Sequence, residues 1–245
     1  MKFIKTLKIV RINNLKKLDM DYYPIHKFNL TMQEMIAIQE ILKKNTTLIN
    51  LEKKPEIISG VDAVYNGNYS LCVIVTFDYK TKKILEVTYA IEKIFVKYKS
   101  GYLAFHELPS FLKAWLNLTI EPNIVVFDGY GYAHPKRFGL ATHASFFIQK
   151  PTFGIAKTPF VGQFEQPATY KGCYRYIKDN DEIIGVVLRT CENRKPVFVS
   201  VGNYCTLSEA IDITLNFSPS TSRIPLLTSF PDQYSKKLKP LLTSF

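Results

Sequence analysis

Two aspartates interrupt runs of apolar residues in this sequence, where a charged side chain is least expected. Asp62 lies inside residues 58–65, and Asp128 ends the apolar run 124–127. A buried carboxylate is costly unless it is paired, hydrogen-bonded or bound to a metal ion. If the two strands are neighbours in a sheet, the carboxylates face each other and repel unless a cation lies between them. Oxygen ligands of this kind suit Mg²⁺, which often also contacts a substrate phosphate.

The residues after Asp128 fit a phosphate. Gly129 and Gly131 allow a sharp turn and a close approach of the backbone to a ligand. An acid at the end of a buried strand, followed by glycines and cations, suggests a metal ion acting on a phosphodiester. A strand-end aspartate that caps a turn is the ordinary alternative, and this stretch alone leaves both readings open. The side chains that suit a phosphate are His134, Lys136 and Arg137.

A third acid, Glu107, lies in the stretch 104–109 just before Leu108-Pro109. We place it at a junction between a strand and a helix, with the helix beginning near Pro109. Taken alone, Glu107 is more simply a helix N-cap or a surface acid. Its interest comes from Asp62 and Asp128, with which it would complete a set of three acids.

Hydrophobic periodicity and turn signals predict the elements that must position these acids. Capping boxes, Thr31 with Glu34 and Thr206 with Glu209, indicate the start of two helices. Three strands in close succession, separated by short turns, predict antiparallel pairing. The predicted strands are 57–65, 69–79, 84–96, 124–127, 152–157, 183–190 and 197–201, and the predicted helices are 31–44, one from about 109, 138–149 and one from 206.

This order predicts an α/β protein in which a mixed sheet, three antiparallel strands and then helix-strand-helix-strand, is flanked by helices. No linker rich in Gly, Ser or Pro divides the chain, so we expect a single domain over residues 1–245. Residues 1–28 are expected to be an N-terminal extension of undecided structure, and residues 233–245 a C-terminal tail.

Composition indicates an intracellular, cytoplasmic protein with a polyanionic partner. The 245 residues include 32 basic and 21 acidic side chains, a net charge of +11. This excess favours nucleic acid, although a basic surface kept for solubility is the alternative. Four scattered cysteines without a CxxC pair fit reduced thiols better than a zinc site. No apolar run reaches the ~18 residues of a membrane span, and we expect a monomer without a membrane partner.

Several motifs, in one order, resemble the endonuclease V family, whose members nick nucleic acid near deaminated bases. The resemblance extends over roughly residues 30–235, and several motifs in one order are far more specific than any single one. The matching stretches are Gly60-Val61-Asp62, residues 101–109 ending in Glu107-Leu108-Pro109, Asp128-Gly129-Tyr130-Gly131, residues 134–141 beginning with His134-Pro135-Lys136-Arg137, residues 151–157 ending in Lys157, and more weakly 199–202.

The resemblance implies a ribonuclease H-like fold and a Mg²⁺ ion, replaceable by Mn²⁺, held by Asp62, Glu107 and Asp128. A fourth position on the metal side falls at Asp232, and His134 and Lys157 would lie near the scissile phosphate. The implied reaction is hydrolysis of the second phosphodiester bond 3′ to inosine or another deaminated base, in DNA repair or in turnover of inosine-containing RNA. It leaves 3′-hydroxyl and 5′-phosphate ends. The implied substrate contacts are Tyr98, Gly101, Leu103, Gly129, Gly131, Lys136, Arg137, Gly139 and Leu140.

Three stretches depart from the family pattern. The wedge loop, typically Pro-Tyr-Ile-Pro, reads Lys97-Tyr98-Lys99-Ser100, so inserting the Tyr98 ring requires more ordering entropy. Gly202-Asn203 replaces the usual Gly-His, and residues 223–229 lack most of Arg-x-Pro-Glu-Pro-x-Arg.

A protein that binds inosine-containing nucleic acid without cutting it is the alternative function for the same fold. A missing acid would indicate it, and Asp62, Glu107 and Asp128 are all present.

Overall fold

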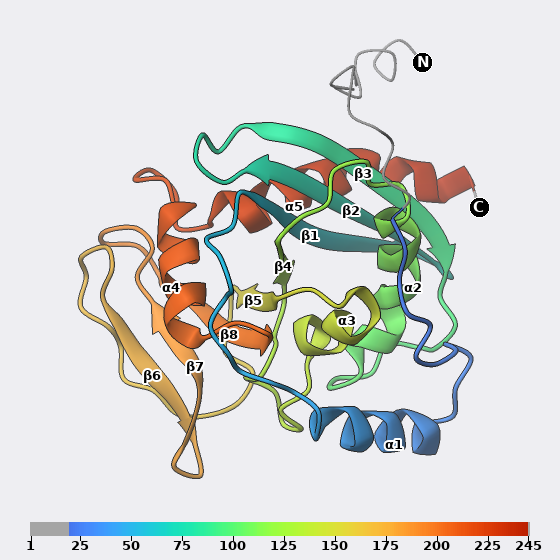
Figure 1. Cartoon of the computed structure of the whole chain (residues 1–245), viewed down its shortest axis with the longest axis horizontal. Coiled ribbons are helices and arrows are strands. Elements are labelled where there is room, and N and C mark those ends of the chain that lie inside the picture. The colour runs from blue at the N-terminus through green and yellow to red at the C-terminus, as the bar shows by residue number, and fades with distance from the viewer. Residues whose placement is uncertain (1–19, 245) are drawn as a thin grey trace.

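Eight strands form one mixed sheet in the computed structural model, which describes residues 20–244 (Figure 1). The strands are β1 (Ile57–Asn66), β2 (Tyr69–Asp78), β3 (Ile84–Lys93), β4 (Ile124–Asp128), β5 (Thr152–Ala156), β6 (Tyr174–Asp179), β7 (Glu182–Leu188) and β8 (Val197–Asn203). Their order across the sheet is β3-β2-β1-β4-β5-β8-β7-β6. The contacts β1–β4 and β4–β5 are parallel and all others are antiparallel.

Helices cover both faces of the sheet, because alternate strand residues point to opposite sides and each side must be buried. One core joins Ile58, Ile124 and Val126 of the sheet to the helices near the C-terminus. The other joins Val61, Val125 and the central helices. The helices are α1 (Met32–Lys43), α2 (Leu103–Trp115), α3 (Leu140–Ile148), α4 (Leu207–Asn216), α5 (Leu226–Leu238) and the 3-10 helix η2 (Lys239–Ser244); α2 and α3 pack on the second core, and α4 and α5 on the first.

The predicted ribonuclease H-like plan is confirmed in its essential parts. β1, β2 and β3 are antiparallel neighbours, and both capping boxes are present, Thr31 with Glu34 and Thr206 with Glu209. The parallel pairing of β1 with β4 makes the strands of Asp62 and Asp128 neighbours, which is the condition that a shared metal site required. Within residues 20–244, no helix is both long and apolar enough to cross a bilayer.

The prediction for the segment around Glu107 was wrong. α2 begins at Leu103 rather than near Pro109, so Glu107 lies within the helix and not at a junction between a strand and a helix. Pro109 lies inside α2, where its missing N–H leaves the carbonyl of Phe105 without its helical partner. Burial of the apolar side chains around it, such as Leu108 and Phe111, stabilises the helix despite the proline.

Two further segments differ from expectation. β6 was not predicted because it is an edge strand whose side chains, apart from Ile177, are mostly exposed, so it lacks an apolar pattern. The expected tail at 233–245 is instead the second half of α5 followed by η2, and Leu242 is buried in the core. Of the N-terminal extension, residues 1–19 lie outside the described residues, and residues 20–28 contain no helix or strand.

Candidate metal centre and adjoining pocket

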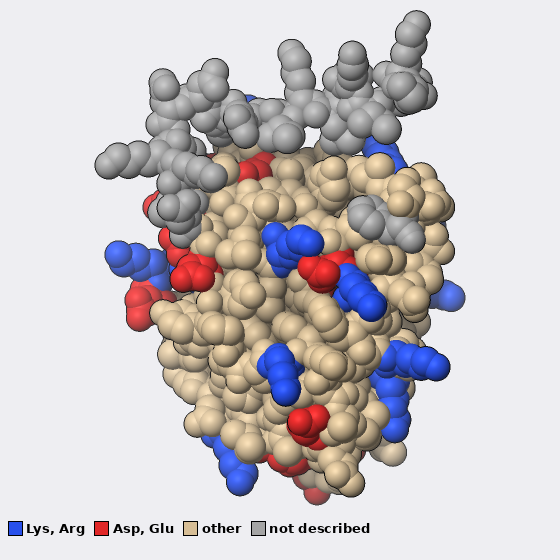
Figure 2. Space-filling view, turned by 90° about the vertical axis from the view of Figure 1, so that its right-hand side faces the viewer, with Lys and Arg blue, Asp and Glu red and all other residues tan. Residues whose placement is uncertain are grey.

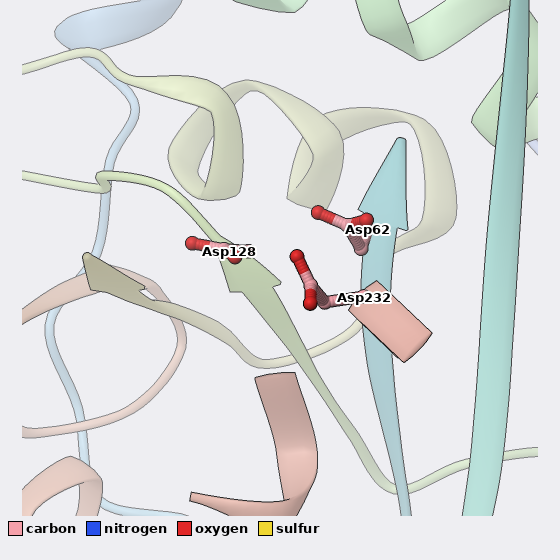
Figure 3. Close-up of side chains that lie close together, drawn as sticks. All are labelled: Asp62, Asp128 and Asp232. Carbon is pink, nitrogen blue, oxygen red and sulfur yellow. The ribbon is translucent and has the colours of Figure 1, made fainter. Parts of the chain in front are cut away.

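Three aspartates from distant parts of the chain meet beside the strands β1 and β4. Asp62 comes from β1, Asp128 ends β4 and Asp232 comes from α5 (Figure 3). One carboxylate oxygen from each lies within 4.8 Å of the other two. Val61 pairs with Phe127 across the parallel strands, so the aspartates that follow these residues lie side by side.

Gly60 allows α5 to approach β1 closely enough to add the third acid. A Cβ atom at this position would lie 1.9 Å from the carbonyl oxygen of Leu227, so no other residue fits without moving the helix. The close approach also brings Ser235 to the site, where its Oγ donates a hydrogen bond of 2.5 Å to Asp62 Oδ2. The glycine of the Gly60-Val61-Asp62 motif therefore sets the distance between α5 and the sheet.

Burial, together with nearby carboxylates, raises the pKa values of Asp62, Asp128 and Glu107. Burial raises the pKa of Asp62 to about 6; the Ser235 hydrogen bond opposes the shift, and Asp128 and Asp232 add to it. Burial likewise raises the pKa of Glu107, with smaller contributions from Asp62 and Asp128. Oxygen donors that repel one another fit a divalent cation such as Mg²⁺ or Mn²⁺, which would offset their charge.

Besides Lys236, whose Nζ lies 2.7 Å from Asp232 Oδ2, Lys157 supplies positive charge to these acids. Its Nζ lies 2.6 Å from Asp128 Oδ2 and 3.5 Å from Asp232 Oδ1. This contact opposes the rise that burial causes in the pKa of Asp128, and Asp128 in turn raises the pKa of Lys157. The lysine therefore stays charged at neutral pH and holds two of the acids from one side.

The structure distributes the four predicted metal-side acids unevenly. It brings together Asp62, Asp128 and Asp232, although the sequence around Asp232 matched the family poorly. Glu107 belongs to α2, and Asp62 and Asp128 add to the rise of its pKa, but it does not join the group within 4.8 Å. A role for Glu107 as a ligand stays a prediction.

A pocket of about 360 Å³ lies next to the acids, on the side of Tyr130. Its lining comes from the loop before α2 and the start of that helix, from the start of α3 and from residues 158–160. Aromatic and aliphatic side chains line it together with the backbone of Gly101 and Gly139. Gly101 has a φ of +83°, a conformation that glycine adopts most readily. Six residues that the sequence singled out line this pocket: Tyr98, Gly101, Leu103, His134, Gly139 and Leu140.

His134 is a neutral wall residue of the pocket. Its ring is buried, and burial lowers its pKa to about 4, against an opposing hydrogen bond to the backbone of Gly101. Its Nδ1 accepts a hydrogen bond of 3.1 Å from the backbone N–H of Lys136. A neutral imidazole at physiological pH would not supply positive charge to a phosphate, and the place of His134 near the scissile phosphate stays a prediction.

Three expected substrate contacts have other partners in the structure. The buried guanidinium of Arg137 binds Asp179 at 2.8 Å and Glu182 at 2.6 Å, and these ion pairs anchor the β6–β7 hairpin. A contact of Arg137 with the substrate stays a prediction. Lys136 lies 3.6 Å from Glu40. A Cβ at Gly131 would lie 2.0 Å from the carbonyl oxygen of Val201, so this glycine serves close packing. Gly129, in contrast, directly follows Asp128 and lies against Leu140 of the pocket.

Two residues near the site escaped the sequence reasoning. Ser235 lies three positions after Asp232, a spacing that places both residues on one face of a helix. It was missed from the sequence because a C-terminal tail, and not a helix, was expected from residue 233. Gln39, a buried side chain of α1, lines the pocket and would have been recognisable only as a polar residue on an apolar helix face.

The excess of basic residues does not form a continuous basic patch on the face that Figure 2 shows. Figure 2 shows a face on which Lys and Arg side chains lie singly among Asp and Glu. Six of the 32 basic residues, and one of the 21 acids, belong to residues 1–19 of the sequence.

Comparisons with known proteins agree with these observations. The endonuclease V family model matches residues 40–233. Endonuclease V of Petrotoga mobilis is 48% identical over 220 residues, which cover 90% of this chain and 99% of that protein. The crystal structure of endonuclease V from Bacillus subtilis is 34% identical, with a TM-score of 0.85 and coverage of 92% of this chain and 99% of that chain. Endonuclease V of Ciona intestinalis, in complex with a DNA 24mer containing an inosine followed by a ribo-adenosine, shares the fold at 24% identity and a TM-score of 0.75, covering 86% of this chain and 98% of that chain.

Replacing Asp62 by asparagine should stabilise the metal-free protein at alkaline pH. Because the pKa of Asp62 is raised from 3.8 to about 6, the stability that its neutral form provides is present below the lower value and is lost as pH rises through the higher one. We expect Asp62→Asn to exceed the wild type in unfolding free energy by on the order of 2 kcal/mol at pH 8, with no difference near pH 4. Urea denaturation in EDTA measures this, and a difference independent of pH would contradict it.

Replacing Ser235 by alanine should weaken metal binding. The variant leaves Asp62 Oδ2 without its hydrogen-bond donor, so the carboxylate loses its fixed orientation. We expect the affinity for Mn²⁺, measured by calorimetric titration, to fall about tenfold. Ser229→Ala, on the same helix, is the control and should bind Mn²⁺ like the wild type. Equal affinities for all three proteins would remove Ser235 from the site.

Proposed function

Because the chain belongs to the endonuclease V family, we propose that it is a metal-dependent endonuclease that cuts the second phosphodiester bond 3′ to inosine or another deaminated base. The products would carry 3′-hydroxyl and 5′-phosphate ends. The observation that carries this proposal is the cluster of Asp62, Asp128 and Asp232 near the pocket that Tyr130 and Leu140 line. The Ciona intestinalis relative, bound to inosine-containing DNA, supports the choice of base.

The acids would hold Mg²⁺, or Mn²⁺ in its place. Asp62, Asp128 and Asp232 offer one oxygen each, and Glu107 is a further candidate on α2. The ion, when bound, would activate a water molecule and offset the charge that develops on the phosphate. The raised pKa values of the free acids imply that binding the ion and releasing protons are coupled.

Lys157 would stabilise the phosphate during cleavage. Its ammonium group lies beside Asp128 and Asp232, so it reaches the region where the phosphate would bind. A fixed positive charge aimed at the developing negative charge needs no reorganisation during the reaction. His134, being neutral, would instead hold the backbone of Gly101 in place.

The pocket would receive the deaminated base after it leaves the base stack, a step that costs a few kcal/mol. Gly101, Leu103, Gly139 and Leu140 contribute its walls, where backbone groups could contact the base edge. Tyr98 is 65% exposed at the pocket rim, so its ring is free to stack in the gap that the base leaves.

Asp128→Asn tests the reaction. The variant is nearly the same size but lacks the charge that balances a divalent ion, so we expect a loss of nicking of at least about 100-fold, or roughly 3 kcal/mol in the barrier. Binding of the strand should be largely retained because basic residues supply much of it. Matched DNA and RNA strands with one inosine, incubated with Mg²⁺ and mapped for product ends, also decide between the two substrates. Asp212→Asn makes the same change at an exposed position on α4 and should cut normally. If Asp128→Asn cuts at the rate of the wild type, the proposed site is wrong.

Tyr98→Ala tests the role of the exposed ring. Without a ring to fill the gap, the flipped base is less favoured, and stacking of this kind contributes ~1–3 kcal/mol. We therefore expect the ratio of cleavage rates on inosine and adenine strands to fall by about tenfold, while metal-dependent cutting persists. Tyr170, which is 62% exposed, provides the control Tyr170→Ala. An unchanged ratio in Tyr98→Ala would assign base selection to the pocket walls alone.

A further inference from the structure

Gln39 is an unusual residue for the helix that carries it. α1 exposes most of its side chains, and its buried residues are Met35 and Gln39. Gln39 is 1% exposed. Glutamine is mostly found at the surface, and a buried amide requires hydrogen-bond partners. The partners of Gln39 therefore indicate why a polar group lies here.

The Gln39 amide joins two segments that are far apart in the sequence. Its Nε2 donates a hydrogen bond of 2.9 Å to the carbonyl oxygen of Gly101 and a longer one of 3.5 Å to the carbonyl oxygen of Phe138. Gly101 belongs to the loop before α2, and Phe138 directly precedes Gly139, the N-cap of α3. Both segments contribute to the lining of the pocket.

The Gln39 amide forms its hydrogen bonds through its N–H donors and not through its oxygen. Gln39 Oε1 is buried and has no hydrogen-bond partner among the described residues. An unpaired buried acceptor costs about 1–3 kcal/mol. An apolar side chain of the same length would fill this space without that cost, so packing alone does not account for the glutamine.

Besides Gln39, the His134 ring holds the Gly101 wall through a hydrogen bond to its backbone, but Gln39 also reaches the carbonyl oxygen of Phe138. Gly101 contributes no side chain, and a Cβ at Gly139 would lie 2.4 Å from the carbonyl oxygen of Tyr130. Where the wall is backbone, as at Gly101 and Gly139, its position depends on the residues behind it. Hypoxanthine presents an acceptor at O6 and a donor at N1–H, and adenine presents a donor at its 6-amino group and an acceptor at N1. Selection between the two bases therefore requires hydrogen-bonding groups held within about 0.5 Å of their best positions.

We propose that Gln39 is a positioning residue that ties the Gly101 wall to the Phe138 wall and thereby determines how well the pocket distinguishes hypoxanthine from adenine. The proposal rests on the function proposed above. Gln39 acts through the two carbonyl groups that it holds and does not itself contact the base.

Gln39→Met tests the proposal, because methionine has a similar length and no donor. Gln33→Met, an exposed position on the same helix, is the matched control. Gln39→Glu is a second variant that keeps the shape and the acceptors but loses both donors. Each protein is measured for binding of fluorescent inosine and adenine strands in EDTA, for cleavage of both strands in Mg²⁺, and for Mn²⁺ affinity.

We expect Gln39→Met and Gln39→Glu to reduce the preference for inosine about tenfold, mainly through weaker binding of the inosine strand. Mn²⁺ affinity should be unchanged, and Gln33→Met should behave as the wild type. If folded Gln39→Met keeps the preference of the wild type, or loses activity on both strands equally, Gln39 has only a structural role and the proposal fails. If the wild type itself shows no preference for inosine in binding or cleavage, the proposed function fails instead.

Discussion

Repulsion among three carboxylates is the constraint on which the rest of this structure depends. Asp62, Asp128 and Asp232 are held within 4.8 Å of one another, although each would be more stable alone in water. Parallel pairing of β1 with β4 holds the first two, and the packing of α5 at Gly60 holds the third. The free energy of burying the two cores thus holds the three carboxylates together despite their repulsion. A divalent cation would relieve this repulsion, so the site is preorganised for such a ligand.

The sequence was informative wherever side-chain chemistry is local. Asp62 and Asp128 were recognisable because a charge inside an apolar run is rare, and the capping boxes identified α1 and α4 directly. It failed where tertiary contacts override local signals. Pro109 suggested a helix start, but apolar burial extends α2 past it in both directions, and Pro231 lies inside α5 in the same way. The role of Asp232 depended on how α5 packs, which no local pattern encodes.

The loop that carries Tyr98 lacks the two prolines that are typical of the family, and hydrogen bonds hold its ends instead. His106 Nδ1 lies 2.9 Å from the carbonyl oxygen of Val96, and the backbone N–H of Tyr102 donates to Lys99 at 3.0 Å. Gln39 holds the loop at Gly101. Contacts at both ends of the loop therefore lower the conformational entropy that the loop would lose when the Tyr98 ring inserts. Tyr98 itself remains exposed between these contacts.

The hydrogen bond between Ser235 and Asp62 joins residues 173 positions apart in the chain. Contacts of such long sequence separation form only after most of the chain entropy has been lost, so they belong to the late stages of folding. A collapsed intermediate that has formed the β1–β2–β3 meander would hold Asp62 but not Asp232. If the acids bind a metal ion as proposed, binding would require the completed native state, and the ion would stabilise that state by mass action. Partly folded copies would then lack a complete metal centre.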